Sequence, residues 1–164
     1  MHRDLERRVR VRIAAGRSLD VDRRLYEIEL RELGVPVERL PAAVERVAAA
    51  VRSLLEDERG QWILAPHAEE SSEWALTADL DGEVRRLGVD RSFVDEDGTR
   101  WIIDYKTSTH EGGALEEFLA AEEQRYAAQL ERYASAVRRL GVERVRTALY
   151  FPLLGAWREL RPPP

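Results

Sequence analysis

Two aspartates and a lysine flank a predicted hairpin turn. Asp90 precedes the turn signal Asp97-Gly98, and Asp104 and Lys106 follow it, within two runs of alternating residues. Side chains two apart on a strand share a face and lie roughly 6.5 Å apart. We therefore expect Asp104 and Lys106 to point to the same face, and the hairpin to bring Asp90 alongside Asp104.

These residue types suit the hydrolysis of a phosphodiester. Two carboxylates offer hard oxygen ligands to Mg²⁺ or Mn²⁺, and a neighbouring ammonium can orient a water or stabilise charge that builds on a phosphate. The chain has 26 Lys and Arg residues, of which Lys106 is the only lysine. A guanidinium cannot replace this compact ammonium, whose pKa is tunable. Because Asp-x-Lys is a common pattern, the alternative is an Asp–Lys surface pair on a strand.

The sequence around these residues resembles a known family. Gly-Val-Asp-Arg at residues 88–91 and Ile-Ile-Asp-Tyr-Lys-Thr-Ser at residues 102–108 resemble the PD-(D/E)XK nuclease superfamily. The fuller match is similar to the RecB-type nuclease domain at the C-terminal end of bacterial helicase-nucleases (RecB/AddA-like, with a UvrD-family helicase). The resemblance implies an α/β (α+β) fold with a restriction-endonuclease-like αβββαβ core, here with additional N-terminal helices.

A second motif supports the same branch of the family. Gln129 and Tyr133 in Gln-Leu-Glu-Arg-Tyr match its Q-x-x-x-Y motif, and residues four apart on a helix share a face. The resemblance implies that this pair faces the site and helps to position the DNA. The alternative is a tyrosine at the edge of the core with a surface glutamine.

The resemblance also implies a metal-dependent deoxyribonuclease, an exonuclease or an endonuclease. Asp90, Asp104, His2 and the backbone carbonyl of Tyr105 would bind Mg²⁺ or Mn²⁺, and Lys106 would position or help to deprotonate the attacking water. The family's metal-ligating histidine usually follows a G-x-x-x context, which is absent before His2.

Two other residues are further candidates. Glu73 lies on the strand before the hairpin, where family members sometimes carry a glutamate of the site; the alternative is an exposed strand carboxylate. His110 follows the site in a His-Glu-Gly-Gly loop, although a loop histidine needs no catalytic role. His67, which follows a proline, is expected to be a surface histidine.

Length and composition predict one domain. The 164 residues suffice for a core, with residues 1–60 as a helical N-terminal part, residues 61–160 as the nuclease core and residues 161–164 as a loose tail. The absence of cysteine excludes disulfides and cysteine-based zinc sites. No apolar run approaches the roughly 20 residues of a membrane span, so we expect no membrane association and a cytoplasmic location.

Charge and motif content suggest a partner. A net charge of −5 argues against a protein that grips DNA through bulk positive charge. A phosphate-binding G-x-x-x-x-G-K-[ST] loop is impossible, because the only lysine follows Tyr105. We therefore expect a helicase motor, in the same polypeptide or in a complex, that delivers single-stranded DNA in double-strand-break repair and recombination, and we expect the chain to be a fragment of a longer helicase-nuclease.

Two other functions stay open. A nuclease-like fold can serve as a non-catalytic DNA-binding or assembly module, although such domains typically lose one of the acidic pair or the lysine, and here all three are present. A stand-alone nuclease without a motor is the third interpretation.

Hydrophobic periodicity predicts the elements that position these residues. Helices are expected at residues 3–15 and 20–33, from Pro41 to about Gly60, and at residues 115–140, the last in one or two pieces. Strands are expected at residues 73–79, 83–94 (with a bend at Gly88), 99–107, 145–151 and 156–160, the first three as an antiparallel meander.

Overall fold

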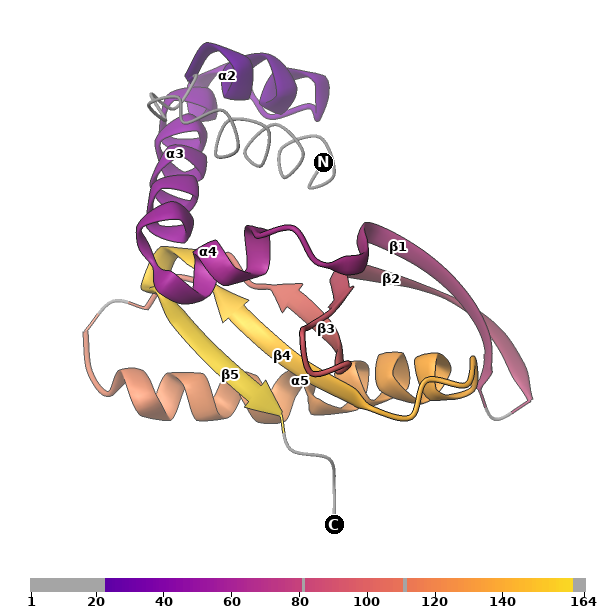
Figure 1. The fold of residues 1–164 in the computed structure, drawn as a ribbon. Coiled ribbons are helices and arrows are strands. Elements are labelled where there is room, and N and C mark those ends of the chain that lie inside the picture. Colours follow the sequence, from indigo (N-terminus) through magenta and orange to yellow (C-terminus); the bar gives the residue numbers. More distant parts are fainter. Residues whose placement is uncertain (1–22, 81, 111, 161–164) are drawn as a thin grey trace. The chain divides into compact units, whose positions relative to one another are not determined.

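The computed structural model describes residues 23–80, 82–110 and 112–160 (Figure 1). These residues form two compact units, one of residues 23–65 with Pro152–Gly155 and one of residues 66–151 with 156–160. The predicted helix at residues 3–15, His2 and the tail lie outside the described residues. No helix in the described part of the chain is both long and apolar enough to cross a membrane.

The first unit is helical. It contains α2 (Arg23–Glu32), η1 (Val37–Arg39), α3 (Leu40–Glu56), α4 (Glu58–Leu64) and η2 (Pro152–Leu154). The hydrophobic periodicity expected of this helix is confirmed, because the buried residues of α3 are Leu40, Val44, Ala48, Val51 and Leu54. These positions recur every three or four residues, which places them on one face of the helix.

The helix α4 corrects the prediction that the third helix runs to about Gly60. Asp57 has an extended backbone (ψ 130°), so α3 ends before it, and its carboxylate accepts a hydrogen bond from the Gly60 amide at 2.9 Å. Asp57 is therefore the N-cap of a new helix. Gly60 lies in the first turn of α4, and residues 61–64, for which no helix was expected, are helical.

The second unit is a five-stranded mixed sheet with one helix. The strands are β1 (Ala68–Leu80), β2 (Glu83–Val94), β3 (Arg100–Tyr105), β4 (Val145–Phe151) and β5 (Ala156–Leu160), in the order β1-β2-β3-β4-β5. Only β3 and β4 are parallel, and α5 (Leu115–Arg138) supplies the crossover that a parallel pair requires. The predicted α/β fold, with a three-stranded meander followed by a helix and a strand, is confirmed.

The helix α5 is continuous rather than in two pieces, and it covers one face of the sheet (Figure 1). Phe118 meets Phe151 of β4 edge to face, with ring centroids 6.2 Å apart. Leu130 and Val137 are fully buried. Successive side chains of a strand point to opposite faces of the sheet, so Leu149 and Phe151 of β4 share one face. Asp104 of β3 pairs with Leu149 in the parallel ladder and therefore lies on that face as well.

The start of β1 differs from the prediction. The strand begins at Ala68 rather than Glu73. Its pairing with β2 shifts register between Ala68 and Ser71. Glu69 (φ 47°) and Glu73 (φ 50°) have left-handed backbones, which breaks the simple alternation that sequence reading detects. The bend expected at Gly88 is not a register irregularity, because Gly88 keeps its regular partner Ala75.

Candidate active site

Asp90 and Asp104 lie at the same end of the β2–β3 ladder. Arg91 pairs with Ile103, so the next step of the same register sets Asp90 opposite Asp104, and opposite residues of antiparallel strands point to one face. The Asp90 Oδ2 atom accepts a hydrogen bond from the Tyr105 amide at 2.9 Å. The register and this hydrogen bond set the two aspartates at one end of the ladder, and their role as metal ligands stays a prediction.

The backbone of Tyr105 adds a third oxygen to this edge. Within a strand, the N–H and C=O of one residue point toward the same neighbouring strand. Because the Tyr105 amide points to Asp90 of β2, its carbonyl oxygen points to that side as well. The next amide, of Lys106, instead donates to the Tyr150 carbonyl of β4 at 2.9 Å.

Lys106, which is half-buried, forms an ion pair with the buried Asp104. Its Nζ atom lies 2.5 Å from the Asp104 Oδ2 atom, and the two side chains are only 15% and 6% exposed. The same ammonium sits 3.6 Å from the centroid of the Tyr126 ring on α5, an arrangement that favours a cation. The alternative of an Asp–Lys surface pair is therefore wrong, because the helix covers this face of the sheet.

Gln129 and Tyr133 complete the cluster from α5. The Gln129 side-chain amide donates to Asp104 Oδ1 at 3.1 Å and to the Tyr133 hydroxyl at 2.7 Å. Burial raises the pKa of the Tyr133 hydroxyl, and the charges of Asp104 and Asp90 add to this, while the Gln129 hydrogen bond opposes it. Tyr133 is thus held as a neutral hydroxyl close to both aspartates.

Sequence reading missed two residues on the same face of α5. Glu122 and Tyr126 precede Gln129 and Tyr133 at helical spacing, so the four side chains form one stripe. Glu122 is only 6% exposed, and its carboxylate accepts a hydrogen bond from the Ser108 hydroxyl at 3.4 Å. The spacing to the Q-x-x-x-Y motif was the signal that could have identified them.

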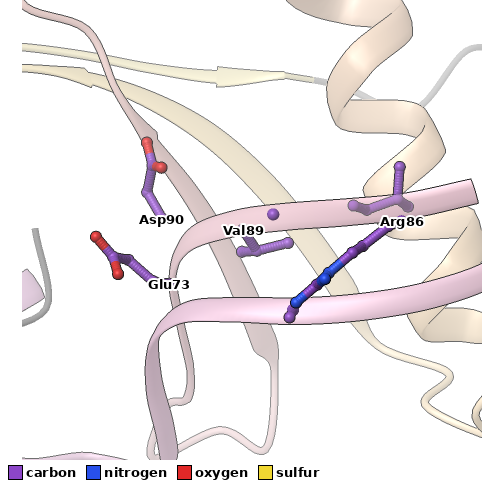
Figure 2. Close-up of a pocket in the computed structure, with 7 residues that line it drawn as sticks. Glu73, Arg86, Val89 and Asp90 are labelled. Atoms are coloured by element: carbon purple, nitrogen blue, oxygen red, sulfur yellow. The ribbon is translucent and has the colours of Figure 1, made fainter. Parts of the chain in front are cut away.

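Glu73 lies beside Asp90. The pairs Ser72–Arg91 and Trp74–Val89 bracket the two residues, so Glu73 stands opposite Asp90. Both line an open cleft of about 400 Å³ on β1 and β2, and Figure 2 shows their carboxylates extending to the same side. A left-handed backbone in a glutamate is uncommon and costs on the order of 1–3 kcal/mol, and such conformations cluster at functional sites.

The two histidines that the structure describes, the candidate His110 and His67, both stack on phenylalanine rings. The ring of His110 stacks on Phe118, with centroids 5.0 Å apart. The ring of His67, which was expected to be a surface histidine, stacks on Phe93 at 3.9 Å, and the residue is half-buried. His2 lies outside the described residues.

The oxygen atoms at the β2–β3 edge suit a hard divalent cation. Mg²⁺ typically takes one or two carboxylates and keeps several waters rather than entering an all-protein cage, and two aspartates with a backbone carbonyl fit that demand. Within the described ranges, no three His, Asp or Glu side chains gather closely enough to hold a metal ion. Glu73 therefore does not complete a three-carboxylate cluster with the two aspartates.

A mixed sheet covered by one helix, with an Asp–Asp-x-Lys cluster at the end of its central strands, defines a nuclease-like class of fold. The model of the PD-(D/E)XK nuclease superfamily matches residues 1–159, and the chain belongs to this superfamily. Its members are generally metal-dependent nucleases that act on DNA.

Comparison with solved structures gives a weaker likeness. One structure, titled "Crystal structure of SSO0001", is 17% identical, and the match covers 98% of this chain and 77% of that chain with a TM-score of 0.39. Comparison with curated proteins finds no significant match.

Proposed function

We propose that this chain is a deoxyribonuclease that hydrolyses phosphodiesters with Asp90, Asp104 and Lys106. The observation that carries the proposal is the position of Asp104, which stands opposite Asp90 and is ion-paired to Lys106 at 2.5 Å. Asp90, Asp104 and the Tyr105 carbonyl would hold Mg²⁺ or Mn²⁺, and His2 is proposed as a further ligand. When bound, the ion would polarise the scissile phosphate and acidify a water.

Lys106 is the proposed partner of the reacting phosphate. Its ammonium is fixed between Asp104 and the ring of Tyr126, which limits the rotation of a long side chain. An ammonium in this position has further N–H donors to orient the attacking water and to stabilise the phosphorane-like charge. Low exposure strengthens this electrostatic effect, since the local dielectric constant is lower than that of water.

Gln129 and Tyr133 are proposed as positioning residues. One amide binds both Asp104 and Tyr133, so it fixes the rotation of the carboxylate and of the hydroxyl together. The raised pKa of Tyr133 keeps the hydroxyl protonated at neutral pH, and it can therefore donate to a DNA phosphate.

We further propose that the substrate is single-stranded DNA delivered by a UvrD-like helicase, in the same polypeptide or in a complex, during double-strand-break repair and recombination. In this proposal the chain is one RecB/AddA-like nuclease domain with a helical N-terminal part. The RecB-type motifs support this context, as does a net charge of −5, with which the chain alone has little long-range attraction for DNA.

The test is the degradation of labelled single- and double-stranded oligonucleotides by the 164-residue chain with Mg²⁺, Mn²⁺ or a chelator. Asp104→Asn is compared with Asp97→Asn, an isosteric change in an exposed turn that retains an Asn-Gly hairpin signal. We expect metal-dependent cleavage by the wild type and by Asp97→Asn and about 10²–10³-fold less by Asp104→Asn. Equal cleavage by Asp104→Asn and the wild type would remove the catalytic assignment, and DNA binding without cleavage would favour the non-catalytic module.

A further inference from the structure

The strands β1 and β2 extend beyond the rest of the sheet. They pair from Ala68–Val94 to Leu80–Glu83, whereas β3 pairs only with Arg91–Val94 of β2. The remainder is a two-stranded ribbon. The open cleft of about 400 Å³ lies on this ribbon, and its lining residues are Glu73, Ala75, Arg86, Leu87, Gly88, Val89 and Asp90 (Figure 2). Asp90 belongs to both the cleft and the proposed metal site, so the cleft opens directly from that site.

We propose that this cleft holds the DNA strand adjacent to the scissile phosphate, with Arg86 binding a backbone phosphate and Gly88 keeping the path between Arg86 and Asp90 open. The proposal rests on the proposed nuclease function and deepens it by giving the path of the substrate strand. In this proposal the ribbon contacts the sugar–phosphate backbone and binds DNA independently of its base sequence.

Arg86 is the one cationic residue among the described residues that line the cleft, and the two other ionisable ones, Glu73 and Asp90, are carboxylates. A phosphate in the cleft would therefore pair with Arg86. Arg86 is exposed, and it forms no ion pair with any residue in the described ranges. A guanidinium binds phosphate with two parallel hydrogen bonds.

The position of Arg86 fits a phosphate near the one that is cut. Arg86 and Asp90 are four residues apart on one strand, so their side chains share a face and their Cα atoms are roughly 13 Å apart. A long side chain that leans along the strand shortens this span. The neighbouring Arg85 points to the other face and is bound by Glu83 at 2.7 Å, which makes it a matched control.

Gly88 lies between Arg86 and Asp90 on the same face. A Cβ atom added at Gly88 would meet no atom within 4 Å, and its backbone lies outside the left-handed region. Neither packing nor backbone conformation requires glycine here, although glycine weakens a strand interior. What the glycine does provide is open space in the floor of the cleft.

The first test is the binding of fluorescein-labelled single-stranded oligonucleotide, measured by fluorescence anisotropy in a chelator at several low salt concentrations. We expect Arg86→Gln to bind about tenfold more weakly and to reduce the slope of log K against log salt by about 0.7. Arg85→Gln should match the wild type, and Arg86→Lys should retain the slope. No wild-type binding at low salt, or equal binding by Arg86→Gln and Arg85→Gln, would overturn the proposal.

The second test fills the cleft with Gly88→Val, a residue favoured in strands. We expect an unchanged or higher midpoint of thermal unfolding, and a KM for the oligonucleotide raised about tenfold at similar kcat. An unchanged KM in a folded variant would exclude the path over Gly88. If the wild type does not cleave at all, the proposed function fails while the anisotropy comparison still decides whether the cleft binds DNA. If cleavage depends on Asp104 but neither Arg86→Gln nor Gly88→Val has its effect, only the cleft assignment fails.

Discussion

The Asp90 carboxylate accepts a hydrogen bond from the backbone amide of Tyr105 at 2.9 Å, at the point where the β2–β3 ladder ends. A side-chain oxygen thus takes the place of a carbonyl acceptor of the neighbouring strand. This bond ties the carboxylate of one strand to the backbone that carries Asp104 and Lys106. The spacing of the proposed catalytic groups is therefore set by strand pairing rather than by a flexible loop.

Asp90→Asn is expected to separate structure from catalysis. The amide oxygen of asparagine can still accept the Tyr105 hydrogen bond, so the midpoint of thermal unfolding should stay within a few degrees of the wild type. The loss of the negative charge should reduce metal-dependent cleavage by about 10²–10³-fold. Initial rates at saturating Mg²⁺ measure the cleavage, and a thermal melt measures the midpoint of unfolding. A variant with wild-type kcat would show that Asp90 is not a ligand.

Lys106→Arg is expected to fail as a conservative substitution. The guanidinium keeps the positive charge, but it is planar and larger than the ammonium that lies between Asp104 and the Tyr126 ring, so it presents its N–H donors from different positions. We expect kcat to fall about 10²-fold or more with little change in the KM for DNA. Steady-state kinetics on an oligonucleotide provide the measurement, and wild-type kcat in Lys106→Arg would contradict the assigned role.

Tyr133→Phe tests the positioning role of the hydroxyl. The ring and its burial remain, and Gln129 keeps its bond to Asp104, so the variant should fold normally. One hydrogen bond to DNA is worth about 1 kcal/mol, which corresponds to a roughly fivefold loss in kcat/KM.

The raised pKa of Tyr133 also has a consequence for stability. Its contribution to the free energy of unfolding is fully present below the unfolded-state value of 10.0 and is lost as the pH rises through the higher folded-state pKa. The free energy of unfolding, measured with denaturant above pH 10, should therefore decline less steeply with pH in Tyr133→Phe than in the wild type. Parallel curves for the two proteins would contradict this prediction.

Asp95 provides a stability prediction in acid. Burial raises the pKa of its carboxyl, but the hydrogen bonds from the Trp101 indole and from the amides of Thr99 and Asp97, with the charge of Arg146, outweigh it and lower the pKa below 3.8. The resulting stability is present above the unfolded-state pKa and is lost as the pH falls through the lowered folded-state value.

We therefore expect Asp95→Asn to lower the free energy of unfolding by about 1 kcal/mol at pH 7, with the difference shrinking as the pH approaches 3. Urea unfolding at several pH values measures it. Asp97→Asn is the control, because the Asp97 side chain is exposed at the tip of the same turn. A pH-independent difference for Asp95→Asn would show that its charge is not responsible.

Metal binding is testable without activity. A ligand at a hundredfold excess over its Kd stabilises the folded state by about 2.7 kcal/mol. Mn²⁺ should therefore raise the midpoint of thermal unfolding of the wild type and of Asp97→Asn but not of Asp104→Asn. An equal rise in Asp104→Asn would locate the ion elsewhere.

The parts of the fold that sequence reading predicted are those with a strict period. Alternation fixed the strands around Asp90 and Asp104, and the helical spacing of Gln129 and Tyr133 identified their shared face. The first strand was found only in part, because the left-handed backbones at Glu69 and Glu73 interrupt its alternation. The sequence around a residue in an apparently regular strand does not reveal that its backbone φ angle is unusual.

Other features depend on tertiary contacts. The burial of Lys106 results from the rotation of α5 about its axis, which brings Tyr126 over the ammonium, and sequence periodicity does not specify that rotation relative to the sheet. The break at Asp57 was missed for a different reason. An aspartate within an apolar stripe looks like an ordinary surface position until its carboxylate is seen to cap the following helix.

The helix α5 directly follows β3 in the chain, and the Gln129–Asp104 hydrogen bond joins residues only 25 positions apart. Short loops close with little loss of entropy, so the hairpin and the crossover helix can bring these groups together early in folding. With the exception of His2, the proposed catalytic and positioning residues, from Asp90 to Tyr133, therefore lie in one uninterrupted stretch of polypeptide.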